Sequence, residues 1–447
     1  MTFIPHTDKD RQEMLAAVGV DRIDDLYEAI PEDVRFPDLD LPDPISEMEI
    51  TQELQALSEA NLDVFHTSCF LGAGAYNHFI PSVVDHTLRR NEFYTAYTPY
   101  QPEISQGTLQ SIFEYQSLVS QLTGMDVSNA SHYDGATALA EAVILALNHH
   151  RGKRSKIVVS PAIHPHYRQV VRTYTQGMGL TITGDEKCGT EPKELVKMLD
   201  EDTALVAVQY PDFFGNITDL SVLGEAAQAS GALFCVVVNP LALGMLVPPG
   251  DFGADIVVGD GQPLGIPLSY GGPTVGIFTT KDKYVRKMAG RLVGETVDNR
   301  GQRGFVLTLT PREQHIRRDR ATSNICTNQG LMALASAVYL SVMGKQGLRK
   351  VAELCYHKAH YAAERIDALK GFKLWNIYPF FHEFVVKCPR AVAEINERLL
   401  EWDILGGYDL GQDYPDLKDH MLIAVTEVIA KEEIDDLVAA LEEVSND

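Results

Sequence analysis

The chain has 447 residues, of which 45% are apolar, and its formal net charge at pH 7 is −24. This length and composition allow a large buried core and predict one large domain with a smaller one. The acidic balance excludes nucleic-acid binding as the main task, because phosphate backbones require clustered lysine and arginine.

The charge is distributed unevenly along the chain. Residues 281–320 hold eleven Lys and Arg against five Asp and Glu, whereas residues 1–60 hold four against sixteen. We attribute most of the excess of Asp and Glu over Lys and Arg to a role in keeping the protein soluble. The basic segment is expected to meet an anion or an acidic partner.

The cysteines are scattered and form no CxxC pair, at positions Cys69, Cys188, Cys235, Cys326, Cys355 and Cys388. This spacing indicates neither a zinc site nor a disulfide framework, and it fits the reducing cytosol. Residues 1–11 lack the apolar stretch of a secretion signal, and the most apolar predicted helix, 331–342, is shorter than the roughly 20 residues of a membrane span. We therefore expect a cytoplasmic protein without a membrane segment.

Residues 1–60 are predicted to form an amino-terminal helical arm. Apolar residues at helical spacing indicate two short helices within residues 8–30, and a stretch rich in proline and aspartate follows to about Pro44. An arm too small to own a core lies on the main body or on a neighbouring subunit, and both placements stay open.

Two unusual loops follow, FLGAGAYNHFIP and YTAYTPYQPEISQG, both rich in glycine, proline and tyrosine. Neither sequence suits a plain helix or a clean strand, so ordered loops are predicted. Tyr97, Tyr100 and Gln101 are candidates for substrate or interface contacts, because ordered polar loops often carry function. The alternative is a buried aromatic loop whose hydroxyl groups are satisfied.

From Ser131 onward, short β-branched runs alternate with helical patterns, which predicts a parallel or mixed sheet with helices on both faces. The predicted strands are 157–159, 180–183, 204–209, 233–238, 256–258 and 275–279. The helix that begins within SHYDGATALAEA offers first-turn amides as a potential anion pocket. Residues 61–368 form the expected large α/β domain. Residues 369–447 form a small α/β domain with strands near 384–386 and 422–425 and helices near 391–402 and 432–444.

The loop GDGQPLGIPLSYGGP follows the predicted strand 256–258, where open α/β sheets hold their ligands. In pyridoxal-phosphate enzymes a loop of this kind carries the lysine that forms a Schiff base with the cofactor. Here no lysine lies between Lys197 and Lys281, and no arginine lies between Arg172 and Arg286. Dehydrogenase, P-loop, zinc-protease and α/β-hydrolase signatures are also absent.

Three motifs, YTPYQPEISQGTLQSIFEYQ, SHYDGATALAEA and REQHIRRDRATSNICTNQ, closely resemble the amino-terminal half of glycine decarboxylase, the P-protein of the glycine cleavage system. The resemblance covers nearly the whole chain. That family is built either as one long chain of two homologous halves or as two subunits, and this chain resembles the first, or alpha, subunit. The resemblance implies an aspartate-aminotransferase-like fold, fold type I of the pyridoxal-phosphate enzymes, with a large domain and a small carboxy-terminal domain.

The resemblance also implies that the cofactor site of this chain is degenerate. Aligned with the catalytic half of the family, Gln262 and Pro263 stand at the positions of a His-Lys pair. Asn239 and Pro240 follow the strand that should end in the aspartate partner of the pyridine nitrogen. No catalytic and no cofactor-binding residue is therefore expected in this chain.

By the same resemblance, pyridoxal phosphate is bound by a catalytic beta subunit in an α2β2 complex. The complex decarboxylates glycine and passes the aminomethyl group to the lipoyl arm of H-protein, with a functional link to the T- and L-proteins. This chain would support the interface and wall the active site.

Histidines and arginines complete the candidates. His164 and His166 stand where such enzymes keep a ring-stacking residue, but a structural role is favoured, and a metal role has little support. Among the basic residues, Arg317 and Arg318, with Arg312 and Arg320, are expected at the interface or at the mouth of the active site, unless they form ion pairs within the chain.

Two further readings stay open. The chain could be a self-sufficient pyridoxal-phosphate enzyme that uses Lys281 or Lys283. It could also be a noncatalytic regulatory or binding protein built on the same fold.

Overall fold

The computed structural model describes residues 5–189 and 191–446 and contains two compact units, Met1–Leu62 and Asp63–Asp447. In the first unit, α1 (Asp8–Val18) and α2 (Glu47–Glu59) each begin with a capping box, at Thr7 and at Ser46. Two 3-10 turns stand between them, η1 (Ile23–Tyr27) and η2 (Glu32–Val34). The second of the two predicted helices is therefore only a short turn, because Pro31 soon follows it. Residues 1–4 of the polar segment 1–11 lie outside the described residues.

The helices of the first unit enclose no hydrophobic core. No residue of α1 or α2 is buried. Large apolar side chains are exposed along the whole unit, among them Val18, Leu39, Leu41, Met48, Leu54 and Leu57.

A seven-stranded sheet organises the body, with the order β2-β8-β7-β6-β5-β3-β4. The strands are β2 (Val127–Ser128), β3 (Lys156–Val159), β4 (Thr181–Thr183), β5 (Thr203–Tyr210), β6 (Leu233–Val238), β7 (Ile256–Asp260) and β8 (Gly276–Thr280). Strands β4, β3, β5, β6 and β7 run parallel, and β8 is antiparallel to both β7 and β2. The prediction of a single, mainly parallel sheet is confirmed.

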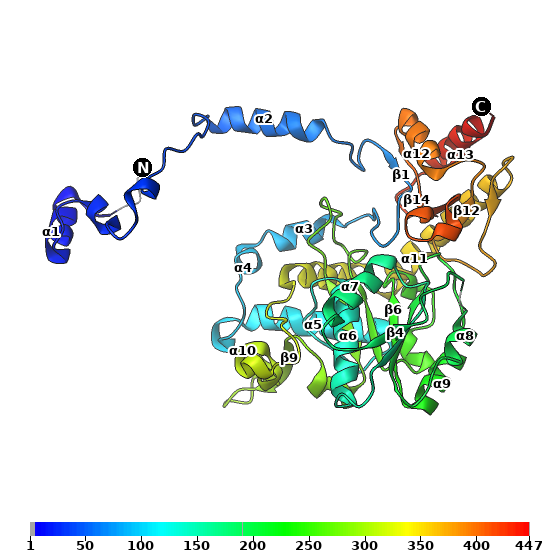
Figure 1. Ribbon diagram of the computed structural model, residues 1–447, viewed down its shortest axis with the longest axis horizontal. Helices are drawn as coiled ribbons and strands as arrows, with labels where there is room; N and C mark the ends of the chain where they lie inside the picture. The colour runs from blue at the N-terminus through cyan, green and yellow to red at the C-terminus, as the bar shows by residue number, and fades with distance from the viewer. Residues whose placement is uncertain (1–4, 190, 447) are drawn as a thin grey trace. The chain divides into compact units, whose positions relative to one another are not determined.

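Helices cover both faces of this sheet (Figure 1). Leu205 and Ala207 of β5 pack in one core with α6 (Gly135–His149) and α7 (Pro165–Thr175). Val206 and Val208 of the same strand pack in a second core with α8 (Pro192–Val196) and α9 (Ser221–Ser230). Successive side chains of a strand point to opposite faces, so a strand buried on both sides must be apolar throughout.

A third layer is built around α11 (Gly330–Asp367), which contacts α3 (Ser82–Leu88) and α5 (Gln106–Thr123). The helix is much longer than the apolar run 331–342, although its path is broken at Gly344, where φ is 57°. By length and composition α11 could cross a membrane. That evidence is weak, because core helices pass the same test, and Tyr339 and Cys355 of α11 are fully buried in the body.

The carboxy-terminal elements, orange to red in Figure 1, form a four-stranded sheet with two helices. The sheet has the order β11 (Lys373–Leu374), β12 (Glu383–Lys387), β15 (His420–Ala424) and β14 (Tyr408–Asp409), and the helices are α12 (Val392–Leu399) and α13 (Lys431–Asn446). A further short strand of this part of the chain is β13 (Ile404–Leu405). An early strand, β1 (Ser68–Cys69), pairs with β13 outside that sheet. The small lobe is therefore tied to the start of the body as well as to α11.

One hairpin had no counterpart among the predicted elements. Strands β9 (Leu292–Val297) and β10 (Arg303–Thr308) pair antiparallel and contact α5. The remaining short elements are α4 (Asn91–Tyr94), α10 (Gln314–Arg317), η3 (Pro102–Ile104), η4 (Ala242–Gly244), η5 (Pro249–Phe252), η6 (Asp282–Lys287), η7 (Thr310–Arg312), η8 (Arg318–Arg320), η9 (Leu400–Trp402), η10 (Leu410–Gln412) and η11 (Pro415–Leu417).

Candidate functional site

The loop after β7 places a carboxylate on the first turn of α6. Asp260 accepts hydrogen bonds from the backbone N–H of Gly135 at 3.2 Å and of Gln262 at 2.9 Å, and from the hydroxyl of Thr274. Asp134, the N-cap of α6, accepts from the N–H of Thr137 at 2.8 Å. The first-turn amides of α6 were predicted to form a potential anion pocket. Two of them instead donate to carboxylates of the chain itself, Gly135 N to Asp260 and Thr137 N to Asp134.

Gln262 and Pro263 are both buried in this loop. The Gln262 amide accepts from Tyr76 N at 2.9 Å and donates to Tyr76 O at 2.9 Å and to Ile266 O at 2.8 Å. The side chain thus joins the loop to the glycine-rich segment around Tyr76. It is a structural bridge with no hydrogen-bonding group left over for a ligand.

Pro263 lines a cavity of about 30 Å³ together with Tyr167, Asn239 and Asp260. A water molecule needs about 10–15 Å³ by this measure, whereas pockets for organic ligands have roughly 300–1,000 Å³. The cavity offers no amine, and the amide of Gly135 at the start of α6 already donates to Asp260. The residues present do not fit pyridoxal phosphate.

Asn239 and His164 complete the wall of this small cavity. Asn239 Nδ2 lies 2.9 Å from Nε2 of His382, and its Oδ1 accepts from Leu241 N at 3.1 Å. His164 Nδ1 accepts from His166 N at 3.1 Å, so Nε2 donates to Ala73 O at 2.8 Å. Burial lowers the pKa of His164 to about 4. The His164 ring is neutral and held by backbone groups, and His166 is exposed.

The two lysines considered for a self-sufficient enzyme, Lys281 and Lys283, lie at the opposite end of β7 from the Pro263 loop. Thr280, the last residue of β8, pairs with Ile256, the first residue of β7, whereas the Pro263 loop follows the end of β7. Lys281 Nζ donates to Asp255 Oδ1 at 3.0 Å, and Lys283 Nζ lies 3.4 Å from the same oxygen. Both amines are engaged far along the strand from the cavity at Pro263.

Tyr97, Tyr100 and Gln101 are exposed, so the alternative of a buried aromatic loop was wrong. Tyr97 is 83% exposed and lines a pocket of about 230 Å³ between the loop before η3 and the start of α11. Tyr100 is 51% exposed and turns its hydroxyl toward Arg291. The Gln101 side chain caps no backbone group of η3.

Arg291 is a residue that the sequence interpretation missed, and it lies in the wall of the same pocket. It is 3% exposed and donates to the hydroxyl of Tyr100 at 3.2 Å, with Asn328 Oδ1 at 3.5 Å and Glu313 Oε2 at 3.7 Å from its guanidinium. Its Nε is the guanidinium atom that faces Glu313 and has no hydrogen-bond partner within residues 5–189 and 191–446. Only the basic bias of residues 281–320 pointed to it, and that bias did not single it out among eleven residues.

The four arginines of the basic segment divide into two groups. Arg312 donates to the carbonyl oxygens of Leu309, Met288 and Gly290, so its guanidinium is engaged within the chain. The other three, Arg317, Arg318 and Arg320, are exposed and form no ion pair among residues 5–189 and 191–446. They remain candidates for an intermolecular contact.

One cluster of metal-ligating side chains is buried where α11 meets the small lobe. Atoms of His78, Cys355 and Glu427 lie within 4.8 Å of one another. They are already joined by hydrogen bonds, with His78 Nδ1 at 2.7 Å and Cys355 Sγ at 3.3 Å from Glu427 Oε2. These three residues lie far apart along the chain, so they form no metal-binding motif that is visible in the sequence.

Comparisons with known proteins give a consistent result. The family model described as "Glycine cleavage system P-protein" matches residues 1–441. The chain is 56% identical, over the full length of both chains, to a protein of Thermomicrobium roseum named "Probable glycine dehydrogenase (decarboxylating) subunit 1".

Among solved structures, an inhibitor-bound glycine decarboxylase (P-protein) of the glycine cleavage system matches with a TM-score of 0.92 and 43% identity, over 99% of this chain and 100% of that chain. A sphingosine-1-phosphate lyase of Burkholderia pseudomallei matches with a TM-score of 0.65 and 13% identity, over 93% of this chain and 94% of that chain. The last match concerns the fold alone, which is that of the fold type I pyridoxal-phosphate enzymes.

Proposed function

Since the chain belongs to the glycine cleavage system P-protein family, we propose that it is the noncatalytic alpha subunit of a heteromeric glycine dehydrogenase (decarboxylating). In this assignment the partner beta subunit holds pyridoxal phosphate, and the complex decarboxylates glycine and passes the aminomethyl group to the lipoyl arm of a carrier protein. The observation that carries the proposal is Pro263 at a cavity of about 30 Å³.

The task of this chain in the complex is to build a wall of the partner's active site. The pocket beside Tyr97 supports this assignment, because it is open, aromatic and backed by the buried cation Arg291. The Arg291 guanidinium brings positive charge to this wall, although the buried Glu313 carboxylate lies 3.7 Å from its Nε. Positive charge favours a carboxylate, which is the group that glycine loses. The exposed Arg317 and Arg318 would extend this wall toward the partner's acidic groups.

The assembly that we propose contains two copies of each subunit and resides in the cytosol. The six cysteines, all free, support a reducing compartment. The name "subunit 1" of the Thermomicrobium relative supports a second subunit. Native mass spectrometry of the co-expressed pair measures the stoichiometry directly.

Borohydride trapping tests where the cofactor binds. The co-expressed complex is loaded with pyridoxal phosphate and reduced, and peptides of both subunits are mapped by mass spectrometry. We expect a phosphopyridoxyl lysine on the partner only, because Pro263 has no amine with which to form the imine. A reduced adduct on any lysine of this chain would overturn the proposal.

A Pro263→Lys variant provides the matched control. Alone, it should remain without the absorbance of an internal imine, because Asp260 still occupies the amides of α6 and the cavity stays too small. A yellow, reducible Pro263→Lys protein would mean that the rest of the cofactor site is intact.

A further inference from the structure

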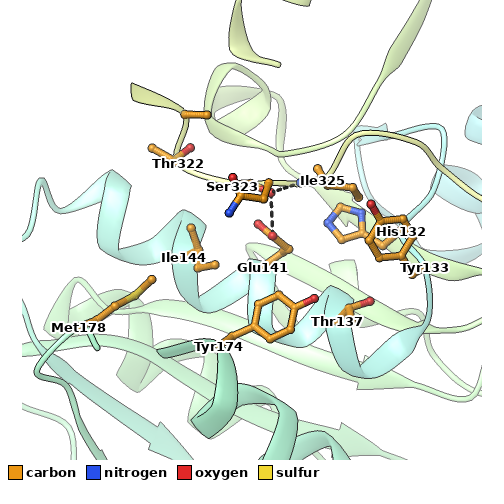
Figure 2. A pocket seen from close by; sticks show the side chains of 12 residues that line it. His132, Tyr133, Thr137, Glu141, Ile144, Tyr174, Met178, Thr322, Ser323 and Ile325 are labelled. Atoms are coloured by element: carbon orange, nitrogen blue, oxygen red, sulfur yellow. Dashed lines mark hydrogen bonds between the residues drawn. The ribbon is translucent and has the colours of Figure 1, made fainter. Parts of the chain in front are cut away.

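A second pocket of about 230 Å³ lies between α6, the end of α7 and the loop 321–325 (Figure 2). It shares no lining residue with the pocket beside Tyr97 or with the cavity at Pro263. Its function is therefore not explained by the wall of an active site or by the vestige of a cofactor site.

Glu141 of α6 is the unusual residue of this pocket. Its carboxyl lies between Ser323 and Tyr174 in Figure 2, and it is 6% exposed. Oε1 accepts from the Ser323 hydroxyl at 2.7 Å, but Oε2 is buried without a hydrogen-bond partner among the described residues. A buried polar atom without a partner is costly, and in native proteins such an atom needs an explanation.

The other polar groups of the lining are suited to accept hydrogen bonds from a cation. Hydroxyl groups come from Tyr133, Thr137, Tyr174, Thr322 and Ser323, whereas no lysine or arginine lines the pocket. The hydroxyls of Tyr133, Thr137 and Ser323 each accept one backbone N–H already and keep a second lone pair. Burial lowers the pKa of His132 to about 3, so that ring brings no positive charge. The carboxyl and the hydroxyl oxygens together favour a positively charged donor.

The rest of the wall is apolar. Ile144, Met178 and Ile325 line the pocket beside Glu141, as Figure 2 shows. A fully hydrated metal ion would gain nothing from such a surface, whereas a short hydrocarbon would be removed from water by it. The volume of about 230 Å³ is below the roughly 300–1,000 Å³ of sites for drug-sized ligands, which limits the ligand to a few heavy atoms.

We propose that this pocket is a binding site for a small aliphatic primary amine. Its ammonium group donates to Oε2 of Glu141 and to the neighbouring hydroxyls, while its alkyl group contacts Ile144, Met178 and Ile325. The burial of Glu141 raises its pKa to about 7, and an ammonium partner would keep this carboxyl ionised at neutral pH. Because Ser323 bonds the other oxygen, loop 321–325 forms one wall of the site.

Calorimetric titration of the full chain, alone and in complex with its partner subunit, tests the proposal with methylammonium and n-propylammonium chloride. We expect one saturable site per chain in both forms. Affinity should rise about three- to fourfold for each added methylene. n-Propanol, which lacks the charge, and propionate, which carries the opposite charge, should not bind. Titrations in sodium and in potassium buffers should agree.

Glu141→Gln removes the charge and keeps an oxygen that can accept from Ser323. It should weaken propylammonium binding by about tenfold or more, as expected for the loss of a charged hydrogen bond. Glu225→Gln, an exposed site on α9, makes the same change of charge elsewhere and should bind like the wild type. Ile144→Phe narrows the apolar part and should weaken propylammonium more than methylammonium, which keeps the test usable if Glu141→Gln fails to fold.

Four results of the titrations would overturn the proposal, and a fifth concerns the assembled complex. These are the absence of saturable binding to the wild type, equal binding by Glu141→Gln, equal binding of n-propanol, and competition by potassium that identifies an inorganic cation site. Loss of binding on assembly would also overturn it, because the pocket would then be filled by the partner. None of these readouts uses glycine turnover, so they are independent of the proposed enzymatic function.

Discussion

Single buried carboxyl groups shape the pH response of the body. Burial raises the pKa of Glu383 and of Asp212 to about 7 and that of Asp260 to about 6. Each group binds its proton more tightly in the folded chain than in the unfolded one. Their contribution to stability is therefore largest below the unfolded pKa, near 4, and is lost as pH rises through the folded pKa.

Glu383 gives a direct test of this relation. Its two oxygens accept from Ala73 N and from the Tyr76 hydroxyl, each at 2.8 Å. Glu383→Gln keeps an acceptor but cannot ionise, so relative to the wild type it should gain on the order of 3 kcal/mol of unfolding free energy between pH 4 and 8. Urea unfolding at several pH values measures the difference, and the exposed Glu225→Gln serves as the control. A constant difference across pH would contradict the assignment.

Tyr97, Tyr100 and Gln101 test the wall of the active site. Because Tyr97 and Gln101 are exposed, replacing them by Phe or Leu should change the unfolding free energy by less than about 0.5 kcal/mol. Tyr100→Phe removes the hydroxyl that accepts from the buried Arg291, so it should cost about 1–3 kcal/mol. Decarboxylation by the complex should fall roughly ten- to a thousandfold, as expected when a positioning or charge-stabilising contact is lost. Turnover and Tm are measured on the same variants. Wild-type turnover in all three variants would remove this loop from the active site.

The role of a residue could be predicted when the evidence for it lay in its own stretch of sequence. Pro263 and Gln262 were identified because the missing lysine is visible in the sequence itself. The pairs Glu141–Ser323 and Arg291–Tyr100 join residues separated by 182 and 191 positions. No periodicity or motif brings such residues together, so both pockets could be found only once the chain was folded.

At the scale of elements, six of the seven strands of the main sheet were predicted to within one or two residues, whereas the short edge strand β2 was not predicted. The predicted strands were easy to recognise, because a strand buried on both faces is a continuous β-branched run bounded by polar residues. The β9–β10 hairpin was missed because its outer residues are exposed and polar, and its register depends on packing against α5. The break of α11 at Gly344 was missed for a similar reason, because one glycine in a helical pattern does not reveal its φ.

The loop that follows β10 is expected to be an intermolecular contact. Arg317→Glu with Arg318→Glu should weaken assembly with the partner, most strongly at low salt, because exposed charges are screened as ionic strength rises. Lys345→Glu with Lys350→Glu, two exposed lysines of α11, makes the same change of charge on another surface. Affinities are compared by sedimentation at two salt concentrations. Equal effects of the two pairs would mean that only net charge matters.

At the scale of the whole molecule, the amino-terminal unit has apolar side chains but no core. Such a segment gains stability only against another surface. We expect that deletion of residues 1–62 leaves the body folded, with an unchanged Tm, and lowers the affinity for the partner subunit at least tenfold. A fall in the Tm of the isolated chain instead would place the unit on its own body.

The hydrogen bond from the Gly135 amide of α6 to Asp260 bears on how the two subunits compete for cofactor in the cell. Free pyridoxal phosphate is scarce and reactive, and a subunit that retained even weak affinity for its phosphate would compete with its own partner during assembly. The Asp260 carboxylate is covalently part of the site, so it competes for the Gly135 amide as an intramolecular ligand with a high effective concentration. In the assignment proposed above, each pair of subunits would then bind a single cofactor molecule, on the partner.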